Sequence, residues 1–244
     1  MSPRQKQTAH PGSIDATTSR FEHEALAVVL QVREGSVHVL LWRRAREPFD
    51  GRWSLPGGRL DSAERLGTSL SRHLAAKVDL TEIGFLEQLE TRSDVERDPR
   101  GRVIATAYLA LVSTAADPTV PADTGWFPVD HLPPTAFDHA SIIRSGLDRL
   151  RAKLTYTNLA FALVPDHFTI AHLRVVYEAC LGHVVTPTNL QRVLLRRRII
   201  EPTELVAPPS SAGGRPRSTA SASAACASLT PSPPSARPRE AGRD

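Results

Sequence analysis

Apolar runs that are short enough for β-strands divide the N-terminal half of the chain. Residues 25–32 are almost continuously apolar, as expected of a strand buried on both faces, whereas residues 85–92 alternate between apolar and polar positions. Further strands are predicted at residues 37–42, 53–55, 103–112 and 125–129. The sequence of residues 98–101, DPRG, has proline second and glycine fourth, which indicates a β-turn and predicts a hairpin between the flanking strands.

Two stretches have the spacing of helices. In residues 62–78 apolar side chains recur every four positions and form one stripe, which comprises Leu66, Leu70, Leu74 and Val78. Asp61 or Ser62 can cap the start of this helix. A second helix is predicted near residues 139–153. Several strands interrupted by two helices fit an α/β/α sandwich.

Residues 154–206 have a different organisation, with two short helices and no strand pattern. Thr169 is placed to cap the first helix and Gly182 to end it. The apolar face of this helix comprises Leu173, Val176, Tyr177, Cys180 and Leu181. Thr186 and Pro187 begin the second helix, since proline favours the first helical position. The second helix continues through Leu190, Val193, Leu194 and Arg197. Two short helices joined by a glycine-containing turn form a helix-turn-helix candidate.

The second of these helices is basic, whereas the first is not. Arginine and asparagine read guanine and adenine edges, and hydroxyls at a helix start contact phosphates. The candidate DNA-binding residues are therefore Thr186, Thr188, Asn189, Arg192, Arg196, Arg197 and Arg198. The alternative is a solvated charged face, which is the usual meaning of an arginine cluster. The position of the arginines on the second helix of the pair favours DNA binding.

Residues 58–80 resemble the Nudix box, a catalytic motif, but lack its carboxylates. The positions that match its glycine, glutamate, arginine and apolar residues are Gly58, Glu64, Arg72, Leu74 and Leu80. The positions that hold three glutamates and a glycine in the box are here His73, Ala76, Lys77 and Asp79. Mg²⁺ requires hard oxygen ligands, so alanine offers it nothing and the Lys77 ammonium would itself occupy the place of the cation. His73 could serve a softer metal, but a single histidine is more often a surface or packing residue. We therefore predict no metal site, no catalytic residue and no cofactor.

The segment before the box, VHVLLWRRAREPFDGRWSLPGG, resembles the strand and loop that precede it in Nudix proteins acting on ADP-ribose-like compounds. Arginines donate to phosphates, and glycines let backbone approach a ligand closely. The candidate effector-binding residues are Arg44, Trp53, Gly57, Gly58, Arg59, Arg100 and Arg102. Solvated arginines and a structural tight turn at the glycines are the alternatives.

The order of the two modules resembles the NrtR family of Nudix-related transcriptional regulators of NAD metabolism. The resemblance covers residues 22–205 and includes the segments DPRGRVIATAYLALV, YTNLAFALVP and TNLQRVLLRRRIIEPT. It implies a homodimeric repressor of NAD biosynthesis or salvage genes, which binds double-stranded operator DNA. It also implies that ADP-ribose or a related nucleotide, bound by the Nudix domain, releases the repressor from DNA.

One part of this resemblance is incomplete. Family members continue after the second helix through a β-hairpin wing, whereas here residues 214–216, GRP, lead into a segment rich in serine, alanine and proline. The wing is either incomplete or replaced by a tail. The predicted organisation is a disordered arm at 1–21, a Nudix-like effector domain at 22–153, a winged helix-turn-helix domain at 154–206 and a disordered tail at 207–244.

Composition agrees with a DNA-binding role without establishing it. The net charge is +4, which suits a polyanionic partner. The chain has 2 cysteines, which makes a structural disulfide improbable, and we find no membrane-spanning segment or signal peptide. The expected location is the cytoplasm, in association with the nucleoid.

Three functions remain in competition. The first is a ligand-responsive repressor of the α+β class, with a Nudix sandwich followed by a winged helix-turn-helix. The second is a hydrolase of ADP-ribose or a related nucleoside diphosphate with an atypical metal site. The third is a ligand-binding module whose C-terminal helices serve protein association only. The helix-turn-helix favours the first over the third, and Ala76 with Lys77 disfavours the second.

Overall fold

The structure, a computed structural model, describes residues 21–196 of the 244-residue chain. The strands are β1 (Glu22–Arg33), β2 (Ser36–Arg43), β3 (Trp53–Ser54), β4 (Gly57–Arg59), β5 (Phe85–Arg92), β6 (Val103–Leu111) and β7 (Thr124–Pro128). The helices are α1 (Leu66–Val78), α2 (His139–Leu154), α3 (Ile170–Leu181) and α4 (Pro187–Arg196), with short 3-10 turns η1 (Val129–His131) and η2 (Leu159–Leu163). Each strand and helix predicted from the sequence is present.

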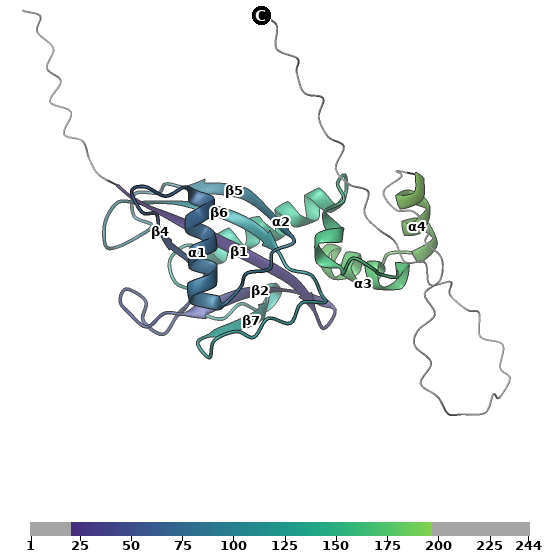
Figure 1. The fold of residues 1–244 in the computed structure, drawn as a ribbon, viewed down its shortest axis with the longest axis horizontal. Coiled ribbons are helices and arrows are strands. Elements are labelled where there is room, and N and C mark those ends of the chain that lie inside the picture. Colours follow the sequence, from purple (N-terminus) through teal and green to yellow (C-terminus); the bar gives the residue numbers. More distant parts are fainter. Residues whose placement is uncertain (1–20, 197–244) are drawn as a thin grey trace, which may run out of the picture.

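The strands form one mixed sheet in the order β3-β2-β1-β6-β5, with β4 also paired to β1 and β7 to β2. Central strand β1 is antiparallel to β2 and parallel to β6. Figure 1 shows α1 crossing one face of the sheet, while α2 lies behind it. The α/β/α sandwich is therefore confirmed.

The continuous apolar run in β1 follows from this burial on both faces. Ala25, Ala27 and Val29 pack in the core beneath α1, whereas Leu26 and Val28 join the core on the α2 side. Successive side chains of a strand point to opposite faces, so a strand covered by a helix on each side needs apolar residues at every position.

The start of α1 differs from the prediction. The helix begins at Leu66 rather than at residue 62, and its N-cap is Arg65, which makes no side-chain capping bond. Neither Asp61 nor Ser62 is therefore the cap. The physical reason is that Glu64 Oε2 accepts a hydrogen bond from the backbone N–H of Asp61 at 3.4 Å, which closes a turn immediately before the helix.

The predicted hairpin around residues 98–101 is confirmed as the antiparallel pair β5–β6. Gly101 has φ 147°, a backbone conformation that favours glycine. The connection is longer than a tight turn, because β5 ends at Arg92 and β6 begins at Val103.

The C-terminal helices agree closely with the sequence pattern. Thr169 Oγ1 accepts a hydrogen bond from the backbone N–H of His172 at 3.0 Å, and Gly182 ends α3 with φ 75°. The buried face of α3 comprises Leu173, Val176, Tyr177 and Cys180, and α4 buries Leu190 and Leu194. In Figure 1 these helices lie beyond one end of the sheet.

Several predictions lie outside residues 21–196, namely the two tails, the wing, Arg197 and Arg198. Within the described part of the chain, no helix is both long and apolar enough to cross a membrane.

Candidate functional site

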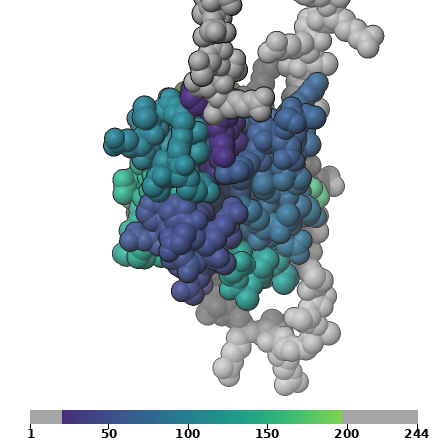
Figure 2. Space-filling view, turned by 90° about the vertical axis from the view of Figure 1, so that its left-hand side faces the viewer, coloured from purple at the N-terminus to yellow at the C-terminus, as the bar shows by residue number. Residues whose placement is uncertain are grey.

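A small cavity lies where the start of β1, β4 and the end of α1 meet. Its volume is about 30 Å³. The residues that line it are Glu24, Leu26, Trp42, Arg44, Arg46, Ser54, Leu55, Gly57, Gly58, Lys77, Arg100, Phe137 and His139. Figure 2 looks at this end of the domain, where the blue-violet segment near residue 50 and the blue segment of residues 60–80 surround the start of β1 in purple. The cavity is therefore assembled from segments that are distant in the sequence.

The lining is strongly cationic. It includes Arg44, Arg46, Lys77 and Arg100, against the single carboxylate of Glu24. Like charges gathered in a partly desolvated space repel one another, so a bound anion would relieve this repulsion. The charge balance therefore favours an anionic ligand and disfavours a free divalent cation.

Lys77 occupies the inner part of the site. Its Nζ donates to the carbonyl oxygen of Gly57 at 2.5 Å and lies 4.4 Å from the ring centroid of Trp42. Burial lowers the pKa of Lys77 to about 8, and the charges of Arg46 and Arg44 act in the same direction. The ammonium is thus held at a position that the Nudix box normally gives to a carboxylate, facing the cavity.

Arg44 supplies donors that the protein does not use. Its Nε donates to the carbonyl oxygen of Pro48 at 3.0 Å, and its guanidinium lies 4.8 Å from the ring of Phe137. Its Nη2 is buried without a hydrogen-bond partner, as is the hydroxyl of Ser54 on the same cavity wall. Burial, together with the neighbouring Arg100, lowers the pKa of Arg44. A buried donor left unpaired is costly, which is a reason to expect a ligand acceptor here.

Arg100 is more fully engaged by its neighbours than Arg44. Its guanidinium donates to Asp98 at 2.5 Å and to Glu24 at 3.4 Å, and the hydrogen bond with Asp98 raises the pKa of Arg100. It also lies 5.5 Å from the ring of Phe137. The guanidiniums of Arg44 and Arg100 therefore both lie close to the ring of Phe137.

His139 closes the floor of the cavity at the start of α2. Its Nδ1 accepts the backbone N–H of Leu55 at 3.0 Å, and burial lowers the pKa of His139 to about 3. The ring is therefore neutral at ordinary pH and carries its proton on Nε2. Asp138, the residue before His139, forms an ion pair with Arg97 at 2.9 Å.

Glu64 and Arg72, the two box residues that do not bind metal in the family, hold the loop that precedes α1. Arg72 donates to both carboxylate oxygens of Glu64, at 2.9 and 2.7 Å, and these hydrogen bonds lower the pKa of Glu64 to about 2. His73 Nε2 donates to the carbonyl oxygen of Arg59 at 3.0 Å, and its ring fills the space beside Gly58. A Cβ at Gly58 would lie 2.6 Å from that ring, and one at Gly57 would meet the Ala25 carbonyl oxygen. Close packing thus accounts for both glycines.

The residues at the box positions do not suit Mg²⁺. Within residues 21–196, no group of three or more His, Cys, Asp or Glu side chains is placed to hold a metal ion. His73 faces the Arg59 carbonyl, Ala76 has no donor atom, and Lys77 presents a positive charge. The family's magnesium chemistry requires oxygen ligands at these positions, and this chain does not provide them.

The structure brings together part of the predicted effector set. Arg44, Gly57, Gly58 and Arg100 line the cavity, whereas Trp53, Arg59 and Arg102 do not. Trp53 packs against Phe127 with ring centroids 4.5 Å apart, Arg59 pairs with Glu22 at 2.7 Å, and Arg102 donates to the carbonyl oxygen of Ser93 at 2.5 Å.

The sequence reasoning missed nine of the thirteen lining residues, among them Lys77, Arg46, Phe137 and His139. Lys77 was assigned only the role of excluding a metal, although its ammonium at a box position was itself a sign of an anion site. Arg46 lies two residues after Arg44 in the run WRRARE, and this cluster of arginines indicates an anion site. His139 is the first residue of α2 and Phe137 lies in the loop before it, and no local pattern connects them to the box.

The second candidate surface is the outer face of α4. Thr186, Thr188, Asn189, Arg192 and Arg196 are all exposed. Arg192 Nη2 donates to Asn189 Oδ1 at 2.8 Å, so the two side chains that were predicted to read bases lie together. Leu190 and Leu194 are buried on the opposite face against α3, which leaves the basic face free of the domain core.

Comparison with known proteins matches both parts of the chain. A model of the NUDIX domain family matches residues 22–146, and a model of the NrtR DNA-binding winged helix domain matches residues 160–218. The second match extends past the described residues, into the region where the wing is expected.

Three relatives illustrate this similarity. The ADPR responsive transcriptional repressor NtrR of Acinetobacter baylyi is 31% identical over 180 residues, which are 71% of this chain and 70% of the relative. An ADP-ribose pyrophosphatase of Methanocaldococcus jannaschii is 32% identical over 128 residues, covering 51% of this chain and 73% of that protein. The crystal structure of Shewanella oneidensis NrtR complexed with a 27mer DNA has a TM-score of 0.69 and 25% identity, covering 86% of this chain and 93% of its own. The chain therefore belongs to the NUDIX domain family, in the NrtR group of regulators that join this domain to a DNA-binding winged helix domain.

Proposed function

We propose that this chain is a transcriptional repressor of NAD biosynthesis or salvage genes, which leaves its operator when ADP-ribose or a related nucleotide binds the Nudix domain. The observation that carries the proposal is the cationic cavity, in which Lys77 takes a place that catalysis would give to a carboxylate. Such a site can bind a diphosphate but lacks the ligands to activate water with a metal. The similarity to an ADPR responsive repressor supports this proposal.

The size of the cavity defines how the effector would be bound. A cavity of about 30 Å³ is far smaller than a small-molecule pocket, which spans roughly 300–1,000 Å³. We place a phosphate of the effector at the cavity, where Arg44 Nη2 and the Ser54 hydroxyl offer unused donors. The nucleoside would lie over the surrounding segments, where Arg59 and Arg102 remain candidate contacts and Trp53 supports the β3 edge.

The DNA contacts are proposed for α4. Thr186 and Thr188 at its start are assigned to phosphates, Asn189 and Arg192 to base edges, and Arg196 to phosphate. Arg197 and Arg198 keep their predicted role, although they lie outside the described residues. A helix-turn-helix commonly reads a two-fold operator as a dimer, so the proposal includes a homodimer formed through the Nudix domain.

One titration tests the function against its alternatives. Binding of fluorescent operator DNA from an NAD-related promoter is measured by anisotropy, with and without ADP-ribose, at fixed salt. The proposal expects operator binding that ADP-ribose weakens by roughly 5- to 150-fold. A module that serves protein association only would bind no DNA, and a hydrolase would consume the ADP-ribose.

Hydrolysis is the second candidate function, because one relative is an ADP-ribose pyrophosphatase. We predict that the purified chain releases no AMP from ADP-ribose in Mg²⁺ or Mn²⁺. Lys77→Glu alone should not restore turnover, because positions 73 and 76 would still lack oxygen ligands. Release of AMP in proportion to protein concentration, abolished by a chelator, would overturn this prediction.

The affinity for the anionic effector should depend on pH through Lys77. Its pKa is about 8 in the free protein because burial disfavours the ammonium. A bound phosphate favours the charged form and raises that pKa, so binding takes up a proton and affinity falls as pH rises through about 8. Calorimetry at pH 7 and pH 9 should show weaker binding at pH 9, and Lys77→Met should remove most of the difference. If the affinity of Lys77→Met declined equally from pH 7 to pH 9, a group other than Lys77 would cause the pH dependence.

A further inference from the structure

The central strand β1 joins the cavity to the helix-turn-helix. Near its start, Glu24 and Leu26 line the cavity, and seven positions after Glu24 it carries Gln31. At about 3.3 Å per residue this is a distance of roughly 23 Å. Figure 1 shows β1 running from the end of the sheet that faces away from α3 towards the end that faces it.

Gln31 is a buried polar side chain that follows the apolar run of residues 25–30 in β1, with 1% of its surface exposed. Its Nε2 donates to two carbonyl oxygens of the loop after β6, those of Ser113 at 2.6 Å and Ala116 at 2.7 Å. The backbone N–H of Val112 donates to the Leu30 carbonyl oxygen at 3.0 Å. These bonds tie residues 113–116 to β1.

The same loop holds the DNA-binding module. The backbone N–H of Thr114 donates to the carbonyl oxygen of Leu163, at the end of η2, at 2.8 Å. The Thr114 hydroxyl bonds His172 Nε2, on the first turn of α3, at 3.0 Å. One residue therefore connects the sheet both to the linker and to the first helix of the helix-turn-helix.

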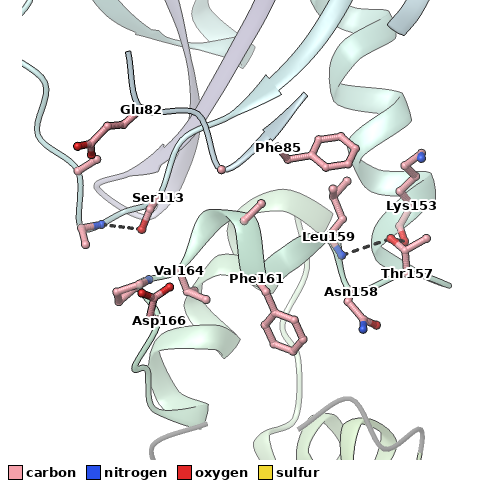
Figure 3. A pocket seen from close by; sticks show the side chains of 15 residues that line it. Glu82, Phe85, Ser113, Lys153, Thr157, Asn158, Leu159, Phe161, Val164 and Asp166 are labelled. Carbon is pink, nitrogen blue, oxygen red and sulfur yellow. Dashed lines mark hydrogen bonds between the residues drawn. The ribbon is translucent and has the colours of Figure 1, made fainter. Parts of the chain in front are cut away.

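An open cleft lies beside these bonds. It has a volume of about 790 Å³, and Figure 3 shows it between Phe85 and Ser113 on the sheet side and Phe161, Val164 and Asp166 on the linker side. Packed cores resist gradual deformation, whereas a gap gives neighbouring elements room to take up a second arrangement. One apolar core continues from the sheet and α2 to α3, and the bonds of Thr114 add polar ties at the edge of that core, beside the cleft.

We propose that Gln31, Thr114 and His172 are the positioning residues that transmit effector binding to the DNA-binding helices. This inference rests on the proposed function. Binding of an anion to the cationic residues of the cavity, next to the start of β1 and β4, shifts β1. Gln31 carries the shift to residues 113–116, and Thr114 then changes the position of α3 through His172. The three side chains touch neither effector nor DNA, so their role is seen in the coupling between the two sites.

The test measures coupling separately from either affinity. Thr114→Val and His172→Leu each remove the side-chain bond and leave the Thr169 cap intact, because that cap uses the His172 backbone N–H. For each full-length variant, operator affinity is measured with and without saturating ADP-ribose, and ADP-ribose affinity is measured without DNA. We expect the ratio of operator affinities to fall at least threefold, while ADP-ribose affinity stays within twofold of wild type.

Matched variants exclude a loss of folding or a general loop effect. Thr119→Val changes an exposed threonine in the same β6–β7 connection. In this variant ADP-ribose should weaken operator binding as much as in wild type. His172→Gln retains a donor near the Nε2 position and should restore part of the coupling. Because Thr114 and His172 share one bond, the double variant should couple no worse than either single variant.

The outcomes separate this inference from the proposed function. Wild type that binds no operator, or that shows no response to ADP-ribose, would overturn the function itself. If ADP-ribose weakens operator binding equally in wild type, Thr114→Val and His172→Leu, the positioning role alone is overturned. Additive losses in the double variant would also overturn it, since independent effects would exclude a shared bond.

Discussion

Replacement of Arg44 by methionine is expected to weaken ADP-ribose binding by roughly 10- to 150-fold. Its Nη2 is a buried cationic donor without a partner in the described structure, and a bond to a charged group contributes about 1.5–3 kcal/mol. Methionine keeps much of the packing against Phe137 and removes the charge. Calorimetry on the DNA-free protein measures the loss, and the response of operator binding should then require correspondingly more ADP-ribose.

The neighbouring Arg43 provides the control. It is exposed, and its Nε donates to the carbonyl oxygen of Gly51, so Arg43→Met removes an equal charge one residue away but outside the cavity. It should change ADP-ribose affinity by less than about threefold, since exposed charges are well screened. If both variants lose affinity equally, the cavity is not the anion site. A thermal melt of Arg44→Met checks that the loop held through the Pro48 carbonyl remains folded.

The sequence predicted the order and type of the elements because each has a local cause. Both faces of β1 are covered, so residues 25–30 of this strand are all apolar, and α3 has a threonine cap and a glycine end. The predicted start of α1 is wrong because a residue suited to capping does not cap where a neighbouring side chain stabilises a different turn. The bond from the Asp61 N–H to Glu64 closes a turn that competes with the helix over residues 62–65.

The cavity was only partly predictable, and the reason is geometric. Arg44 was predicted as a phosphate donor beside the box and Arg100 as one from the predicted hairpin, and both line the cavity. Trp53 follows the same motif, yet strand alternation turns its ring towards Phe127. His139 begins α2 and Phe137 lies two residues before it, about sixty residues after the box, and only the packing of α2 on the sheet brings them to the cavity.

On the DNA side, alanine at Asn189 or at Arg192 is expected to cost roughly 1–3 kcal/mol of operator affinity and to relax sequence preference at one position. The two side chains are bonded to each other at 2.8 Å, so the double variant should lose less than the sum of the single losses. Gln191→Ala, at an exposed position on a different side of α4, is the control and should bind as wild type.

Arg196 should behave differently from that pair, because it is assigned to phosphate. It lies one helical turn after Arg192 on the same exposed face, closer to the end of α4. Arg196→Ala should weaken operator and unrelated DNA alike and should reduce the slope of log affinity against log salt by about one, since one fewer counterion is released. Anisotropy titrations at several salt concentrations measure both quantities. Variants of Asn189 and Arg192 that bind operator as tightly as wild type, with an unchanged preference for it, would show that α4 is not the recognition helix.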